Sequence, residues 1–186
     1  MIARLRALSL PARALIAGVL LTAFFVLGAA QQVWLRTAGD EVILDVAPVD
    51  PRDIFFGHYV ILAYQAERLD SGEVAIPQGL EPGAAWLTLR EDADGIWVPD
   101  SLLKDRPDGA VALRGVLNSP AGPDEDGPIF IELPLPDRYY ASAGTARALE
   151  DSRNDGALQV ILSVRGGAAA IKGLVVDGEA QYDRLF

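Results

Sequence analysis

The chain has 186 residues, of which 26 are acidic and 16 basic, and it contains no cysteine. This length fits one domain of ordinary size with a short leader segment. Arg4, Arg6 and Arg13 are the only charged residues in the first 30 positions, so the body carries 13 basic against 26 acidic residues, a net charge of −13. Such a body repels phosphate backbones, which argues against nucleic-acid binding. Without cysteine, the chain has no disulfide, thiolate metal site or cysteine nucleophile.

An uncharged run from Ala14 to Ala30 follows these arginines. Its 17 residues reach the lower limit for a helix that spans a bilayer. Basic residues ahead of the run place the N-terminus in the cytoplasm and the body on the far side. The small residues 28–30 could form a signal-peptidase site that releases the body, whereas Trp34 and Arg36 could mark the interface end of a retained anchor. We favour the anchor, because the leader and the apolar run are both long for a signal peptide.

These features divide the chain into three parts. Residues 1–13 form a basic cytoplasmic leader, residues 14–34 a transmembrane signal-anchor helix, and residues 35–186 an extracytoplasmic domain. The lipid bilayer is therefore an expected partner through the helix.

Apolar runs between turn residues predict an antiparallel β fold for the body. The expected strands are residues 41–46, 59–64, 85–90, 95–98, 110–117, 129–133, 158–164 and 168–176. Asp94-Gly95 supplies the turn of one hairpin and residues 165–167 the turn of another. The run 59–64 is apolar on both faces, so we expect a central strand covered on both sides. Strands spaced by about ten residues predict a compact antiparallel sandwich or a partly open barrel.

One short helix is predicted over residues 145–152. Thr145 is its expected N-cap, Leu149 a core contact, and residues 154–156 its stop. Residues 176–179 contain a further Asp-Gly turn.

Residues that could carry reaction chemistry are few. His58 is the only histidine, and because no Gly-x-Ser-x-Gly elbow accompanies it we interpret it as a surface or turn residue. Lys172 lies in an apolar strand, and Ser163 lies on the preceding strand, so a serine–lysine pair is conceivable. We favour the interpretation that Lys172 is an edge-strand lysine that discourages pairing between sheets. The acidic residues 124–126 lack the EF-hand pattern and read as a solvated loop.

The run Gly57-His58-Tyr59-Val60-Ile61-Leu62-Ala63-Tyr64, preceded by Pro51-Arg52-Asp53-Ile54-Phe55, resembles the signature of the GDYXXLXY proteins. The named positions match except that His58 stands where the family has Asp. Similarity continues through residues 139–144 and 149–150 to the closing pattern at 167–178. The motif residues, with structural or binding roles expected, are Pro51, Arg52, Asp53, Phe55, Gly57, His58, Tyr59, Leu62 and Tyr64, and in the C-terminal motif Lys172, Gly173, Leu174, Asp177 and Gly178.

The resemblance implies one N-terminal membrane helix, an external β-rich domain and no established activity. It also implies a bacterial inner-membrane protein with a periplasmic body, and a polytopic membrane protein as partner. A fainter similarity links residues 51–60 to serine–lysine proteases of the signal-peptidase type. The nucleophilic serine of those enzymes has no counterpart among residues 47–50.

We therefore predict a non-enzymatic, membrane-anchored domain that binds or assists a membrane-protein partner, with no catalytic residue, cofactor or metal. Two alternatives stay open. One is a serine–lysine hydrolase that uses Lys172, distantly related to signal peptidase. The other is a released periplasmic protein that binds a small apolar ligand inside a barrel.

Overall fold

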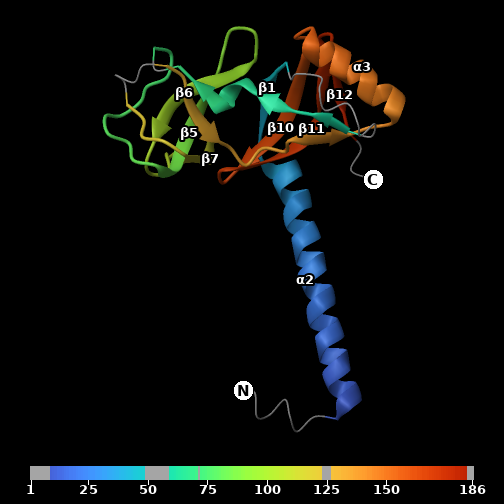
Figure 1. The fold of residues 1–186 in the computed structure, drawn as a ribbon. Helices are drawn as coiled ribbons and strands as arrows, with labels where there is room; N and C mark the ends of the chain where they lie inside the picture. Colours follow the sequence, from blue (N-terminus) through green and yellow to red (C-terminus); the bar gives the residue numbers. More distant parts are fainter. Residues whose placement is uncertain (1–8, 49–58, 71, 123–126, 184–186) are drawn as a thin grey trace. The chain divides into compact units, whose positions relative to one another are not determined.

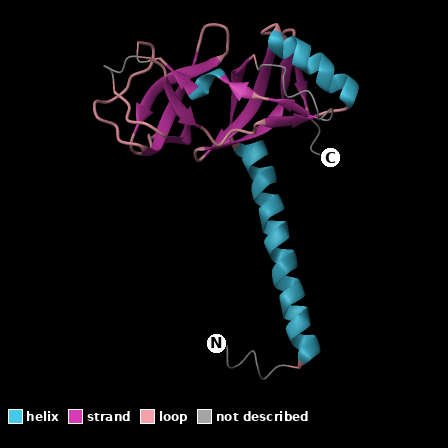
Figure 2. Ribbon diagram, viewed as in Figure 1, coloured by secondary structure: helices cyan, strands magenta, loops and turns pink. Residues whose placement is uncertain are grey.

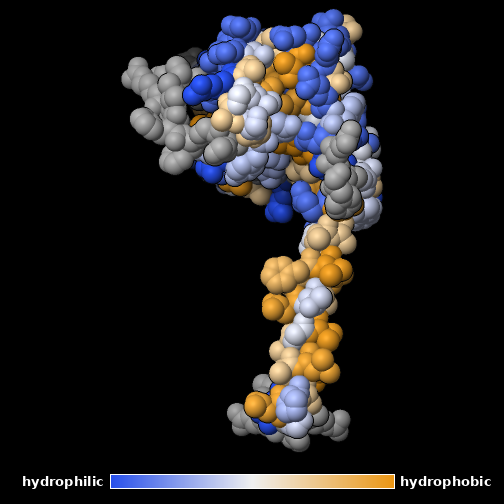
Figure 3. All heavy atoms as spheres, turned by 90° about the vertical axis from the view of Figure 1, so that its right-hand side faces the viewer, coloured by the Kyte–Doolittle hydropathy of each residue, from blue (hydrophilic) through white to orange (hydrophobic). Residues whose placement is uncertain are grey.

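The computed structural model describes residues 9–48, 59–70, 72–122 and 127–183, and it divides into two compact units, Met1–Trp34 and Leu35–Phe186. Helix α2 (Leu10–Ala38) supplies the described part of the first unit, and its last four residues belong to the second. Its most apolar stretch has a mean hydropathy of 2.1, and none of its residues is buried. Figure 3 shows apolar side chains along it. Its 29 residues rise about 44 Å, more than the ~30 Å of a bilayer core, so α2 is long and apolar enough to cross a membrane.

The second unit is built from antiparallel sheets, drawn in Figures 1 and 2. One sheet has the order β12 (Glu179–Tyr182), β11 (Ala168–Val176), β10 (Leu158–Arg165), β1 (Asp40–Ala47), β3 (Ala63–Tyr64). Another has the order β4 (Arg68–Leu69), β8 (Ile129–Glu132), β7 (Ala112–Leu117), β5 (Gly83–Glu91), β6 (Trp97–Leu103). A two-stranded sheet pairs β2 (Tyr59–Ile61) with β9 (Arg138–Tyr140). Helix α3 (Ala143–Asn154) packs on β1, β2 and β10.

The two larger sheets enclose one hydrophobic core. The chain passes from β3 through the 3₁₀ turn η2 (Gln65–Glu67) directly into β4, so the first sheet leads into the second. A backbone bridge between Leu113 and Gly167 joins the sheets again. Core leucines, isoleucines and valines from both sheets are almost fully buried. The structure thus confirms the predicted mainly β fold of the partly open barrel type, with an N-terminal apolar helix.

The hairpins form where turn residues predicted them. Gly95 adopts φ 82° between β5 and β6, and Gly166 and Gly167 adopt φ 62° and 89° between β10 and β11. Asp177 and Gly178 both have positive φ, the geometry of a tight hairpin turn. The sequence did not predict β12, the strand that follows this last turn, nor β4 and β9.

The prediction of one central strand over residues 59–64 is wrong. The segment breaks at Leu62 into β2, whose only strand partner among the described residues is β9, and β3, which pairs there only with β1. The Leu62 N–H donates to the carbonyl of Asp137 (2.9 Å), and the Ile61 carbonyl accepts from the guanidinium of Arg153 (2.9 Å). These two bonds replace the ladder, so one face of the segment is buried and the other is only half covered.

Helix α3 starts earlier than predicted. Ser142, not Thr145, is the N-cap, because the Ser142 hydroxyl accepts from the backbone N–H of Thr145 (3.3 Å). Leu149 is buried in the core as predicted, and the helix ends at Asn154 ahead of Gly156, which adopts φ 74°.

Candidate functional site

Two of the described named positions of the first motif, at residues 57–64, belong to the core. Leu62 is 3% exposed, and Tyr64 is 4% exposed with its hydroxyl donating to the carbonyl of Pro136 (2.8 Å). Burial raises the pKa of Tyr64 far above its usual range, so its phenol stays protonated. Both side chains therefore stabilise the fold, whatever else the motif does. Pro51, Arg52, Asp53, Phe55, Gly57 and His58 lie outside the described residues.

Tyr59 differs, because it is only half buried. It stands opposite Tyr140 in the β2–β9 ladder, with the ring centroids 5.9 Å apart and the planes inclined by 60°. The guanidinium of Arg138 lies 5.1 Å from the Tyr59 ring centroid, within cation–π range. A hydrogen bond with Tyr140 and the nearby carboxylate of Asp137 raise the pKa of Arg138, so Arg138 stays positively charged. We call Tyr59, Arg138 and Tyr140 the tyrosine face.

The broken motif strand is what exposes this face. Because Arg153 donates a hydrogen bond to the Ile61 carbonyl, β2 does not continue the strand pairing of β3 in the large sheet. It pairs with β9 instead. The outer face of this small sheet thus presents aromatic rings beside a cation, with Tyr140 70% exposed. Tyrosine and arginine are, with tryptophan, the residues enriched at the energetic centres of protein interfaces. The arrangement suits protein recognition.

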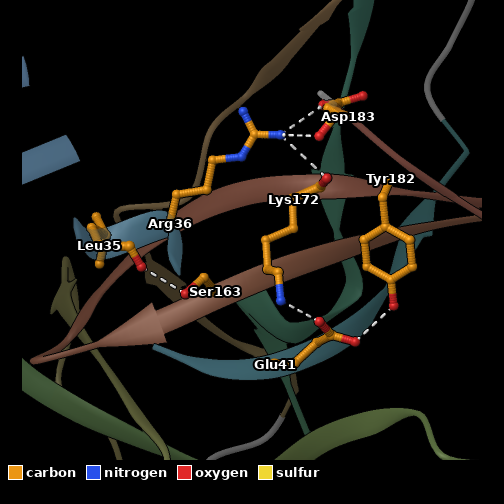
Figure 4. Close-up of polar contacts among 7 residues, drawn as sticks. All are labelled: Leu35, Arg36, Glu41, Ser163, Lys172, Tyr182 and Asp183. Carbon is orange, nitrogen blue, oxygen red and sulfur yellow. Dashed lines mark hydrogen bonds and ion pairs between the residues drawn. The ribbon is translucent and has the colours of Figure 1, made fainter. Parts of the chain in front are cut away.

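A second cluster surrounds the last turn of α2, as Figure 4 shows. The ammonium group of Lys172 forms an ion pair with the Glu41 carboxylate, and the Tyr182 hydroxyl donates to the other oxygen of Glu41 (2.9 Å). The hydrogen bond from Lys172 is the main cause that holds the pKa of Glu41 below its usual range. Together with Arg36 and Asp183, these residues form what we call the junction cluster.

Arg36 and Asp183 complete the junction cluster. The Arg36 guanidinium donates to the carbonyls of Asp183 (3.0 Å) and Lys172 (3.4 Å), and lies 3.8 Å from the Asp183 carboxylate. The Tyr139 hydroxyl donates to the same carboxylate (2.6 Å). Burial, followed by this hydrogen bond, raises the pKa of Tyr139 to about 12. The cluster fixes the final residues of α2 to β11, β12 and β9.

The geometry gives no support to a serine–lysine pair. Ser163 is fully buried, and its hydroxyl donates to the Leu35 carbonyl (2.6 Å) rather than to Lys172. The ammonium group of Lys172 is instead paired with the Glu41 carboxylate.

The interpretation of Lys172 as an edge-strand lysine is wrong. Strand β12 pairs outside β11, so Lys172 is not on an edge. It occupies a bulge between Ile171 and Gly173, where it has no partner in the register with β10.

The remaining residues of the C-terminal motif have structural positions. A Cβ at Gly173 would lie 2.2 Å from the Gln181 carbonyl oxygen, so glycine is needed for β12 to pair. Leu174 is buried in the core, and Asp177 and Gly178 form the turn into β12. The sequence pointed to Lys172 but not to Glu41, Tyr182 and Asp183, because nothing local indicates which distant strand faces it.

Two open clefts, with volumes of about 450 and 480 Å³, are lined by none of the residues of the tyrosine face or the junction cluster. One is lined by Asp40, Trp86, Arg106 and neighbours, and the other by Asp45, Arg68, Trp97 and neighbours. Within the described ranges, no group of three or more His, Asp or Glu side chains could hold a metal ion. The acidic residues 124–126 and His58 lie outside those ranges.

A model of the GDYXXLXY protein family matches residues 21–174, most of the chain. The chain belongs to the GDYXXLXY family. No curated protein and no solved structure matches it. In this member of the GDYXXLXY family, two motif positions that the structure describes, Leu62 and Tyr64, serve the core, whereas Tyr59 reaches the surface.

Proposed function

We propose that this GDYXXLXY protein is a non-enzymatic, membrane-anchored extracytoplasmic domain that binds a polytopic membrane protein through its tyrosine face. The observation that carries the proposal is the position of Tyr59. Among the named positions of the family signature that the structure describes, Tyr59 is the one that is not buried in the core. Its ring contacts Arg138 and Tyr140 on the small two-stranded sheet.

The anchor is supported by α2 and its end. Residues 28–30, which could have been a cleavage site, lie inside a continuous helix rather than in an extended segment. The last turn is bonded to the domain through Leu35, Arg36 and Ala38. Arginines ahead of the apolar run favour a cytoplasmic N-terminus, which would place the domain outside.

The absence of enzymatic activity is supported by how Ser163 and Lys172 are used. The Ser163 hydroxyl is bonded to the Leu35 carbonyl at the end of α2, and Lys172 of β11 is bonded to Glu41 of β1. The remaining motif residues of the C-terminal part shape the β11–β12 hairpin.

Site-specific photocrosslinking tests the proposal. A photoreactive benzoylphenylalanine replaces Tyr140 in the full-length chain, and irradiation is carried out in native membranes. The matched control replaces Phe130, which is similarly exposed (59%) but lies on β8. We expect one adduct with an integral membrane protein from position 140, lost when Tyr59→Ala is added, and none from position 130.

Three results would overturn the proposal. They are equal adducts from both positions, no adduct from position 140, or an adduct with the mass of two copies of this chain. Thermal unfolding of the Tyr59→Ala variant shows whether the loss of an adduct reflects binding rather than misfolding.

A further inference from the structure

A cleft that belongs to neither the tyrosine face nor the junction cluster opens beside the first strand. Its volume is about 450 Å³, and it is lined by Asp40, by Trp86 of β5, by the segment 106–112 between β6 and β7, and by the β10–β11 turn. Its lining carries ionised groups of both signs, Arg106 and Arg165 together with Asp40 and Asp108. A site for a ligand with a single charge would not need this mixture.

The wall of the cleft is built around Trp86. Gly167 has φ 89°, and a Cβ there would lie 2.7 Å from the Trp86 ring and 2.8 Å from the Cβ of Arg114. The Arg114 N–H donates to the Gly167 carbonyl (2.9 Å), which holds the turn against the ring. The Arg106 guanidinium lies 5.7 Å from the ring centroid. The indole is therefore a fixed platform with a cation over it.

The chain itself places this cleft near the end of the anchor. Asp40 follows Ala38, the last residue of α2, by two positions, a reach of at most about 7 Å. The Arg165 side chain donates to the Ala38 carbonyl. If α2 spans the membrane, as our proposed function requires, the cleft lies within reach of the lipid headgroups, a region where tryptophan is enriched.

We propose that this cleft binds the headgroup of a phospholipid that carries a primary ammonium group, of the phosphatidylethanolamine type. The arginines face the phosphate, and the carboxylates of Asp40 and Asp108 accept from the ammonium N–H groups. A choline headgroup has no N–H donors for these carboxylates. An anionic glycerol headgroup has no cation for them and is repelled by a body with a net charge of −13.

Native mass spectrometry of the full-length chain, released from nanodiscs of equal ethanolamine, choline and glycerol phospholipids, tests this inference. We expect ethanolamine lipid to be retained roughly two- to fivefold over either competitor, the factor that exposed ion pairs of this kind give. Asp108→Asn should remove the preference over choline lipid, whereas Asp94→Asn, an exposed aspartate in the β5–β6 turn, should not. Equal retention of the three classes, or a preference that Asp108→Asn leaves unchanged, would overturn it.

Fluorescence quenching provides a second measurement that needs no charge variant. In nanodiscs with a headgroup spin label, Trp86 as sole tryptophan (Trp34→Phe, Trp97→Phe) should be quenched more than Trp97 as sole tryptophan (Trp34→Phe, Trp86→Phe). Equal quenching would contradict the placement of the cleft at the interface.

The two proposals fail in different ways. If the protein isolated from membranes has lost residues 1–30, the anchor is absent and the proposed function is excluded. An anchored chain that retains no headgroup class selectively would contradict only the lipid site.

Discussion

Arg153 is a buried charge that the fold uses structurally. It is 4% exposed, and its guanidinium donates to the Ile61 carbonyl and to the Asn154 side chain. Burial lowers its pKa, but an arginine remains charged in proteins. Its role is to satisfy the carbonyl that the broken motif strand leaves without a ladder partner.

Replacing Arg153 should therefore destabilise the domain. Arg153→Met keeps an apolar stem but leaves the Ile61 carbonyl buried without its donor, which costs about 1–3 kcal/mol in the free energy of unfolding. Thermal unfolding of the full-length chain in detergent, followed by near-ultraviolet circular dichroism, should show a clear fall in Tm. Arg147→Met on the exposed side of α3 is the matched control, with a change within about 0.5 kcal/mol. Equal effects of the two variants would contradict this role.

Glu41 predicts a pH dependence of the junction cluster. Its folded pKa is depressed, so its ion pair with Lys172 stabilises the domain above the unfolded pKa of about 4.3, and this stabilisation is lost as the pH falls through the folded pKa. The side chain is 40% exposed, so the contribution is at most about 1 kcal/mol.

The measurement compares Tm for the wild type and Glu41→Gln between pH 7 and pH 3. The wild type should be more stable at pH 7, and the difference should close at acidic pH. Burial raises the pKa of Glu67, so ionisation of Glu67 changes the stability with pH in the opposite direction. Both proteins contain Glu67, so this contribution cancels in the Tm difference. A difference that is constant with pH would rule out the ion pair as its cause.

Among the elements, β12 depends on one glycine. All four of its residues are exposed, so it is held by pairing with β11 and by Tyr182 rather than by core side chains. At Gly173 an added Cβ would meet backbone atoms of Gln181 and Tyr182 at 2.2 and 2.8 Å, and backbone cannot move aside as a side chain can.

Gly173→Ala should therefore separate β12 from β11. We expect a loss of roughly 1–3 kcal/mol, as for overpacked sites, and faster hydrogen exchange in residues 179–182. Gly144→Ala in α3 is the control, because a Cβ there meets nothing within 4 Å. Unchanged exchange in β12 would show that the pairing tolerates a side chain.

The elements that the sequence predicted are those whose turn chemistry is local. Asp94-Gly95 and residues 165–167 carry enough information to define their hairpins. Strands β4, β9 and β12 were missed because they have only two, three and four residues, too few to show a periodic pattern. The motif segment was taken as one strand because its apolar pattern is continuous, whereas the break depends on Arg153, 92 residues away in the chain.

The candidate site was predictable only as far as the motif itself. Tyr59 was identified from the signature, but Arg138 and Tyr140 join it through a strand pairing that the sequence did not reveal. Lys172 was identified as unusual, yet its partner Glu41 lies 131 residues away. Long-range partners of this kind are set by register, which a one-residue shift would change entirely.

For the whole molecule, we expect that the domain stays attached to α2. The last turn of the helix is bonded to the domain through Arg36, and residues 28–30 are helical. The intact mass of a C-terminally tagged full-length chain, purified from membranes, should then include residues 1–30. A mass that corresponds to a chain beginning near Gln31 would contradict the anchored function and favour a released ligand-binding protein.

The placement of β1 determines how the chain that follows α2 is held in the domain. It is the first strand after α2, and it lies between β10 and β3 rather than at the rim of its sheet. Six successive residues, Asp40–Asp45, pair with β10. Its last two residues, Val46 and Ala47, pair with β3. The strand that follows α2 can therefore leave the domain only if pairing with two neighbouring strands is broken, which a strand at a sheet edge would not require.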